Sequence, residues 1–180
     1  MATTYKLVFA GPVGAGKTTA IQSLSDIEVV RTEASATDDV KQLKQTTTVA
    51  MDFGRITLDD DLVLYLFGTP GQQRFWFMWD ELSEGALGAV ELADTRRLED
   101  SFAAVDYFER RSIPFLVAVN CFDGAVRYPS DSVRQALDLD PGVPVVLCDA
   151  RDRQSAKDVL IDLIEHAMRY TADHRQPVGS

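Results

Sequence analysis

The stretch GPVGAGKTT, residues 11–19, constrains the fold of this chain more than any other part of it. A short apolar run, Tyr5 to Ala10, precedes it, and a helix-like segment, Thr18 to Leu24, follows at once. Closely spaced glycines let backbone N–H groups turn inward as a nest for phosphate oxygens, and the start of a helix adds its dipole. The pattern G-x-x-x-x-G-K-[ST] in this context predicts a phosphate-binding loop.

Two side chains of this loop have expected roles at a bound nucleotide. The ammonium of Lys17 supplies positive charge to the β- and γ-phosphates, and the hydroxyl of Thr18 is a ligand for Mg²⁺. A Gly-rich turn with a solvated lysine is the alternative, but its glycines would cost stability without purpose. The predicted nucleotide contacts of the loop are Gly11, Val13, Gly14, Ala15, Gly16, Lys17, Thr18 and Thr19.

Further short apolar runs alternate with helix-like segments. The runs are Leu62 to Phe67, Ala86 to Ala93, Ile113 to Val119 and Val143 to Leu147, and the helical segments are Arg96 to Arg110, Ser130 to Leu139 and Ala156 to Tyr170. Runs of this length suit strands buried on both faces. Thr47 to Leu58 and Asp61 to Phe67, joined by Asp59-Asp60, are typical of a hairpin. The sequence predicts an α/β fold: a doubly wound, mostly parallel six-stranded sheet with one antiparallel strand and helices on both faces.

Composition and charge limit the domain organisation and the class of partner. Residues 1–173 are expected to form one domain, and residues 174–180 a flexible C-terminal tail. The formal net charge of −10 argues against binding to nucleic acid or to an anionic membrane surface. No apolar run approaches the length that spans a bilayer, and the first residues lack the features of a signal peptide. We expect a cytoplasmic protein without an intrinsic membrane anchor, with recruitment to a membrane by a partner left open.

A second candidate loop, VNCFDG, follows the predicted strand that ends at Val119. In open α/β sheets, ligands bind beyond the carboxyl ends of the strands, so this loop and the phosphate loop share one edge. The carboxylate of Asp123 could accept hydrogen bonds from N1–H and the exocyclic amine of guanine, a donor pair that adenine lacks. The next loop, CDARD, would bring the backbone N–H of Ala150 to the guanine carbonyl. A turn of purely structural role is the alternative.

Together these motifs resemble those of the Ras- and Arf-type small GTPases, across about residues 5 to 170. GPVGAGKT resembles their phosphate loop, NCFD their base-recognition motif N-K-x-D, and CDA the loop usually read as S-A-K. GTPGQ, residues 68–72, resembles D-x-x-G-Q, and TVAMDF, from Thr48, resembles the switch I entry of Arf-like proteins. In the detail of these motifs, the chain is most similar to the bacterial gliding-motility (polarity) GTPases and to the conservon-encoded GTPases of actinomycetes.

This resemblance implies roles for the switch residues. The N–H of Gly71 would contact the γ-phosphate, Gln72 would orient the attacking water, and Thr48 would join Thr18 as a Mg²⁺ ligand. The loop after Phe67 would be switch II, which GTP orders and hydrolysis releases. The base-side residues that the resemblance assigns are Asn120, Cys121, Asp123 and Ala150.

The chain departs from the family pattern at three of these positions. Gly68 stands where an aspartate usually holds a Mg²⁺-bound water, so the resemblance leaves Mg²⁺ to Thr18, Thr48, phosphates and water, with weaker magnesium dependence. Cys121 replaces a lysine whose stem stacks over the base, which predicts modest nucleotide affinity. Val13 occupies a position where a side chain can crowd an incoming arginine finger.

Switch I supplies no arginine in cis, because none occurs between Arg31 and Arg55. Arg74, two residues after Gln72, is a substitute, although a solvated arginine is the more common reading of such a position. We therefore expect slow intrinsic hydrolysis of GTP.

The segment RFWFMWDEL follows the switch II loop. Phe75, either Met78 or Trp79, and Leu82 fall at helical spacing for the core, which leaves Trp76 and Phe77 on other faces. Exposed aromatic side chains beside a switch are typical interface anchors, with core packing as the alternative. The resemblance implies regulatory or effector partners of the small roadblock type.

The sequence thus predicts a cytoplasmic guanine-nucleotide switch that binds GTP and GDP with Mg²⁺, hydrolyses GTP slowly and signals through partner proteins. Lys17 and Gln72 are its expected catalytic residues. A non-hydrolysing nucleotide-binding scaffold is one alternative, and an ATP-using P-loop enzyme is another. An ionised carboxylate is costly inside an apolar strand, so Glu91 either pairs with a cation, lies at a strand edge or has a raised pKa, and a role in the metal site is a further alternative.

Overall fold

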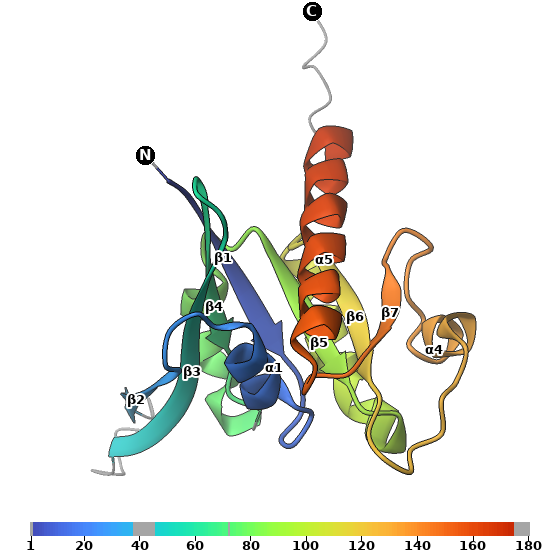
Figure 1. Ribbon diagram of the computed structural model, residues 1–180. Helices are drawn as coiled ribbons and strands as arrows, with labels where there is room; N and C mark the ends of the chain where they lie inside the picture. Colours follow the sequence, from blue (N-terminus) through green and yellow to red (C-terminus); the bar gives the residue numbers. More distant parts are fainter. Residues whose placement is uncertain (1, 38–45, 72, 175–180) are drawn as a thin grey trace, which may run out of the picture.

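The computed structural model describes residues 2–37, 46–71 and 73–174, and its strands form one sheet in the order β2-β3-β4-β1-β5-β6-β7 (Figure 1). The strands are β1 (Thr3–Ala10), β2 (Val30–Thr37), β3 (Thr46–Asp59), β4 (Leu62–Gly68), β5 (Gly88–Ala93), β6 (Phe115–Asn120) and β7 (Val145–Cys148). The helices are α1 (Lys17–Leu24), α2 (Trp79–Ser83), α3 (Phe102–Arg110), α4 (Ser130–Ala136) and α5 (Arg153–His174), with 3₁₀ segments η1 (Gln73–Met78) and η2 (Thr95–Ser101).

The predicted fold class is confirmed. β1 lies at the centre and pairs in parallel with β4 and β5, whereas β3 is antiparallel to both β4 and β2. The predicted hairpin is the β3–β4 pair. All six predicted strands are present, and β2 adds a seventh at the edge of the sheet. Its sequence, VRTEASAT, is too polar to have been recognised as a buried strand.

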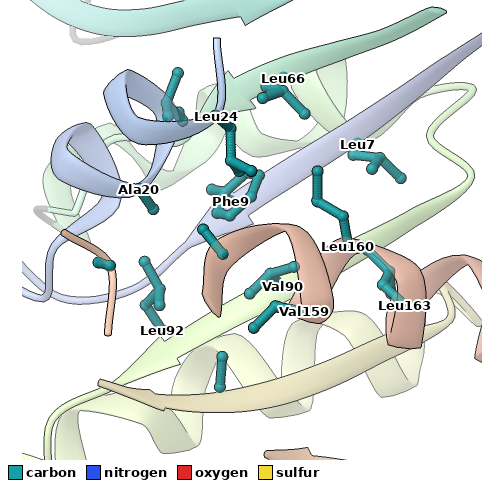
Figure 2. Packing of buried hydrophobic residues seen from close by; sticks show 14 of the residues in the cluster. Leu7, Phe9, Ala20, Leu24, Leu66, Val90, Leu92, Val159, Leu160 and Leu163 are labelled. Carbon is teal, nitrogen blue, oxygen red and sulfur yellow. The ribbon is translucent and has the colours of Figure 1, made fainter. Parts of the chain in front are cut away.

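Helices cover both faces of the sheet, as the apolar runs require. Successive side chains of β1 alternate between two cores, because side chains in a strand point to opposite faces. Leu7 and Phe9 pack with α1 and α5, and Val8 and Ala10 pack with α2, α3 and α4. Figure 2 shows the first core, in which Leu160 and Leu163 of α5 reach the strands. Because β1, β4, β5, β6 and β7 are parallel, their carboxyl ends lie at the same edge of the sheet.

Several predicted boundaries differ from those observed. The expected helix Arg96 to Arg110 is divided into η2 and α3, and α4 stops at Ala136 instead of Leu139. α5 begins earlier than predicted and continues to His174, while 175–180 of the predicted tail lie outside the described residues. Within the described part of the chain, no helix combines the length and apolar character needed to cross a membrane.

Candidate functional site

The phosphate loop joins the end of β1 to the first residue of α1, as predicted. Gly11, Gly14 and Gly16 have φ values of 155°, 80° and 107°, a region that favours glycine. The ammonium of Lys17 folds back over the loop and donates hydrogen bonds to the carbonyls of Gly11 and Pro12. Desolvation lowers the pKa of Lys17 to about 8, with Arg97 adding to this effect and Glu91 and Asp52 opposing it. The negative charge of a bound phosphate would favour the protonated form of Lys17, which burial disfavours.

Gly16 is required by a neighbour as well as by its backbone. A methyl group on its Cα would lie 2.5 Å from Nδ2 of Asn120. That amide donates to the carbonyl of Ala15, and its Oδ1 accepts from the backbone N–H of Ala150. Asn120, 6% exposed, therefore binds the phosphate loop and the predicted base loops together. The N–H of Ala150, which the sequence assigned to the guanine carbonyl, is donated to Asn120 in this structure.

Across the edge of the sheet, Asp52 of β3 takes the place that Gly68 leaves open. Asp52 and Gly68 are paired in the β3–β4 register. A methyl group at Gly68 would lie 3.3 Å from Cβ and 3.5 Å from Oδ2 of Asp52. The same Oδ2 accepts a 2.5 Å hydrogen bond from the hydroxyl of Thr18. Sequence analysis missed this carboxylate because it comes from the neighbouring strand.

The chemistry of this pair fits a magnesium ion. A threonine hydroxyl and a carboxylate are the oxygen ligands that Mg²⁺ accepts, with phosphates and water completing its shell. The expectation that Thr18, Thr48, phosphates and water serve the metal stays a prediction, and Asp52, which is in contact with Thr18, is a further candidate ligand. Thr48 lies in β3, but its side chain falls outside the described residues, so its role stays a prediction.

The segment after β4 is fixed on both sides. The N–H of Thr69 donates to the carbonyl of Phe9 in β1, and the indole N–H of Trp79 donates to the carbonyl of Pro70. Gly71 consequently lies against the phosphate loop: a methyl group there would be 2.8 Å from N of Val13 and 3.1 Å from Nζ of Lys17. The structure thus brings Gly71 to the phosphate loop, while its contact with a γ-phosphate stays a prediction. Gln72 and the side chain of Arg74 lie outside the described residues.

The predicted base-side residues line one cavity of about 320 Å³. Asp123 lies at this cavity with its side chain 87% exposed and forms an ion pair with Arg151, N to O 3.1 Å. Such an exposed pair is weak, so a ligand can displace it at little cost. The full lining is Gly16, Thr19, Arg96, Asn120, Cys121, Phe122, Asp123, Ala150 and Arg151.

The turn after β5 adds two arginines that sequence analysis did not select, although it marked the loop after Ala93. Arg96 donates to both oxygens of Asp94, which is fully buried. Its guanidinium carbon lies 4.2 Å from the ring centroid of Phe122, in the base-side cavity. Arg97 donates from Nη2 to the carbonyl of Val13 in the phosphate loop. The hydrogen bond from Arg96 is the main reason that the pKa of Asp94 is lowered.

Glu91 is fully buried at the base of a second cavity, of about 370 Å³, beside Gly71 and the phosphate loop. Among the described residues, neither of its carboxylate oxygens has a hydrogen-bond partner, and the same is true of the nearby Ser101 hydroxyl and Trp76 indole N–H. Burial raises the pKa of Glu91 to about 8, against the opposing effects of Ser101 and Lys17. Burial therefore favours the protonated, uncharged form of this carboxyl group.

The two aromatic residues predicted to be interface anchors behave differently. Trp76 is half-buried and stacks on Trp79 with ring centroids 4.3 Å apart, so its prediction as an exposed anchor is wrong. Phe77 is 55% exposed and remains available. The stack forms because Trp79 is a core residue, and its ring offers a large apolar face to Trp76.

The chain is similar to known proteins in sequence and in fold. A family model described as "Conserved hypothetical ATP binding protein" matches residues 9–170. An uncharacterized protein of Methanocaldococcus jannaschii is 28% identical over 120 residues, which cover 66% of this chain and 70% of that protein.

Solved structures with the same fold include G domains of iron transporters. The G domain of T. maritima FeoB matches with a TM-score of 0.64 at 18% identity, covering 94% of this chain and 99% of that one. The FeoB G domain of Methanococcus jannaschii gives 0.64 at 17% identity, with 93% and 99% covered. The cytosolic domain of T. maritima FeoB in a GDP form gives 0.70 at 17% identity, covering 93% of this chain but 64% of that one. The chain therefore belongs to the family of conserved hypothetical ATP binding proteins and has the fold of P-loop GTPase G domains.

Proposed function

We propose that the protein is a cytoplasmic guanine-nucleotide switch that binds GTP and GDP with Mg²⁺, hydrolyses GTP slowly and signals through partner proteins. The observation that carries the proposal is the connection through Asn120. This side chain joins the phosphate loop to Ala150 of the base-side cavity, where Asp123 also lies. One ligand that occupied both would have phosphates and a purine base at its two ends.

The choice of guanine rests on Asp123. A carboxylate can accept hydrogen bonds from N1–H and the exocyclic amine of guanine, whereas N1 of adenine presents a lone pair that repels it. ATP is the second candidate, because the family model that matches the chain describes ATP-binding proteins. The two candidates differ only at the base, so they are separated by base preference and not by phosphate binding.

The remaining roles are proposed for residues that would contact the phosphates of the nucleotide. Lys17 would neutralise the β- and γ-phosphates, the N–H of Gly71 would contact the γ-phosphate, and Gln72 would orient the water. Thr18, Thr48 and Asp52 would hold Mg²⁺, which polarises the phosphate oxygens when it is bound.

Partner binding is proposed at the exposed ring of Phe77, next to switch II. The resemblance to bacterial gliding-motility and conservon-encoded GTPases favours a roadblock-type regulator at this surface. If Phe77 is an interface anchor, Phe77→Ala should change the free energy of unfolding by no more than about 0.5 kcal/mol, because the exposed ring contributes little to the core.

Calorimetric titration of nucleotide-free protein with GDP, GTPγS and ATP, with and without Mg²⁺, tests the proposal. We expect GDP and GTPγS to bind and ATP not to bind. In Asp123→Asn, GDP affinity should fall about 10- to 100-fold, because hydrogen bonds to a charged group are lost. Xanthosine diphosphate should gain affinity, since the new amide N–H can donate to its additional carbonyl. Asp131→Asn, on the exposed start of α4, is the matched control.

Two results would contradict the proposal. Equal affinity for ATP and GTP would remove the guanine assignment and leave the family's described ligand in its place. Tight binding of GTP without any conversion to GDP in a single-turnover assay would support the non-hydrolysing scaffold.

A further inference from the structure

Two adjacent arginines leave the turn after β5 towards opposite ends of the proposed nucleotide site. Asp94 contacts both: it accepts two hydrogen bonds from Arg96 and lies 3.7 Å from Nε of Arg97. Arg96 enters the base-side cavity, and Arg97 reaches the phosphate loop. We propose that Arg97 is a catalytic residue that stabilises in cis the negative charge that develops on the phosphates during hydrolysis. This inference rests on the proposed hydrolysis but not on the identity of the base.

The backbone directs Arg97 towards the loop. Inside η2 this residue has φ −146° and ψ 49°, which are not helical values, so the chain departs here from the regular 3₁₀ path. Its guanidinium is then held between two carboxylates, Asp94 and Asp100, at 3.7 and 3.9 Å. An arginine held in this way loses less side-chain freedom when it contacts a ligand.

Three contacts place the guanidinium beside the expected γ-phosphate. Nη2 donates to the carbonyl of Val13, and a methyl group on Gly14 would lie 3.7 Å from the same atom. Arg97 also lines the 370 Å³ cavity with Gly71, whose backbone lies against Nζ of Lys17.

This position suits the charge changes of phosphoryl transfer. The oxygen of water attacks the γ-phosphorus, the bond from that phosphorus to the β–γ bridging oxygen breaks, and the electron pair stays on the β-phosphate of the diphosphate. The protons of the water end on the released inorganic phosphate and on solvent. A guanidinium has N–H groups beyond the one that Val13 accepts, and these can donate to the oxygens where charge accumulates. Arginines that act in this way contribute about 10³ to 10⁵ in rate.

A purely structural role makes a different prediction. If Arg97 only fastens η2 to the phosphate loop, its removal loosens the loop and weakens binding of the diphosphate as well. A residue that acts on the transition state instead lowers the rate and leaves diphosphate binding in place.

The experiment compares wild type with Arg97→Ala and Arg97→Lys, using Arg110→Ala, an exposed arginine at the end of α3, as the control. Aluminium fluoride is added to the protein loaded with GDP and Mg²⁺, because this complex imitates the transferring phosphoryl group. The two tryptophans of the chain, Trp76 and Trp79, both line the cavity that contains Arg97, so intrinsic fluorescence reports the binding. Single-turnover hydrolysis and GDP affinity are measured on the same samples.

We expect wild type and Arg110→Ala to bind aluminium fluoride without a partner, and Arg97→Ala to lose this binding. The single-turnover rate should fall about 10³-fold or more in Arg97→Ala, with GDP affinity kept within about threefold. Free guanidinium ion should restore part of that rate, and Arg97→Lys should recover little, because an ammonium lacks the planar fork.

Equal rates in Arg97→Ala and wild type would overturn the proposal, and so would a loss of rate matched by loss of GDP affinity. Wild type that neither hydrolyses nucleotide nor binds aluminium fluoride alone would also overturn it. A wild type that hydrolyses ATP in preference to GTP would instead contradict the guanine assignment, and the comparison at Arg97 would then be made with ATP and ADP.

Discussion

The hydroxyl of Thr18, at the start of α1, donates a 2.5 Å hydrogen bond to the carboxylate of Asp52 in β3. This contact joins the phosphate loop to the strand that leads out of the predicted switch I. It also leads to a prediction about magnesium, because a carboxylate beside Thr18 can do the work of the aspartate that position 68 lacks.

Asp52→Asn should weaken the binding of Mg²⁺ in the nucleotide complex by about 10- to 100-fold, as expected for a group that orients a metal ligand or its water. The measurement is the Mg²⁺ concentration that halves the dissociation rate of a fluorescent GDP analogue. Asp106→Asn, on the exposed face of α3, is the control. Unchanged Mg²⁺ dependence would mean that Asp52 does not contribute and that Thr18, Thr48, phosphates and water alone hold the metal.

A reciprocal exchange tests the same relationship more strictly. Asp52→Gly combined with Gly68→Asp should recover part of the Mg²⁺ affinity that Asp52→Gly loses. The new side chain at position 68 meets Ile21 Cδ1 at 3.1 Å, the mobile end of a side chain that can shift. No recovery in a double variant that folds normally would show that position 68 cannot replace position 52.

Asn120→Ala should destabilise the fold and abolish tight nucleotide binding together. The substitution leaves the carbonyl of Ala15 and the N–H of Ala150 without partners in a buried region, at a cost of about 2–3 kcal/mol. Urea unfolding measures the first effect and titration with GDP the second. A variant that unfolds like wild type would contradict the proposed connection through Asn120.

Arg96→Ala should reduce nucleotide affinity about tenfold while leaving the rate at which bound nucleotide is hydrolysed unchanged. We expect this because its planar guanidinium, stacked on Phe122 at 4.2 Å, can offer a flat surface to the base where Cys121 cannot. Arg96→Lys should not restore the affinity, since an ammonium has no plane to stack. Loss of rate without loss of affinity would place Arg96 at the phosphates instead.

Glu91 should make the stability of the protein fall as the pH rises. Burial raises the pKa of Glu91 from its ordinary 4.5 to about 8, so the folded protein keeps a proton that the unfolded chain has lost. Between these two values the folded state binds more protons, and stability decreases with increasing pH. Urea unfolding from pH 5 to pH 9 should show this slope.

Glu91→Gln should flatten that profile and stabilise the protein at pH 9 by about 2 kcal/mol, because no charge is then buried. The exposed Glu99→Gln is the control and should keep the slope. A profile identical in wild type and Glu91→Gln would mean that another group carries the pH dependence.

The central part of the fold could be predicted from sequence because each signal there is local. The apolar run before Gly11, the glycines of the loop and the helical spacing after Lys17 all specify the same strand–loop–helix unit. The strand β2 could not be predicted in this way, since its sequence, VRTEASAT, contains no apolar run.

The role of Asp52 shows where local reasoning ends. The ladder begins with Asp59 opposite Leu62, and a regular continuation would pair Asp52 with Thr69, but the register shifts by one residue between Thr57 and Asp59. A shift of one residue reverses the face to which every side chain points. The pairing of Asp52 with Gly68 therefore depends on an irregularity that no residue pattern announces.

The two arginines of the turn after β5 escaped prediction for a related reason. Each depends on a residue distant in the sequence: Arg96 contacts the ring of Phe122, and Arg97 contacts the backbone carbonyl of Val13. The predicted strand that ends at Ala93 places this turn at the edge of the sheet, but it does not indicate which of the residues that follow turn inward.

The pairing of Asp52 with Gly68 also affects how proteins of this kind are recognised. A sequence motif that requires an aspartate three positions before Gly71 rejects this chain, although the carboxylate of Asp52 lies beside the hydroxyl of Thr18. A search template built from atoms in space, with a carboxylate oxygen near the hydroxyl that follows the phosphate-loop lysine, would accept it. Collections sorted by linear motif alone will therefore divide proteins that a three-dimensional template would keep together.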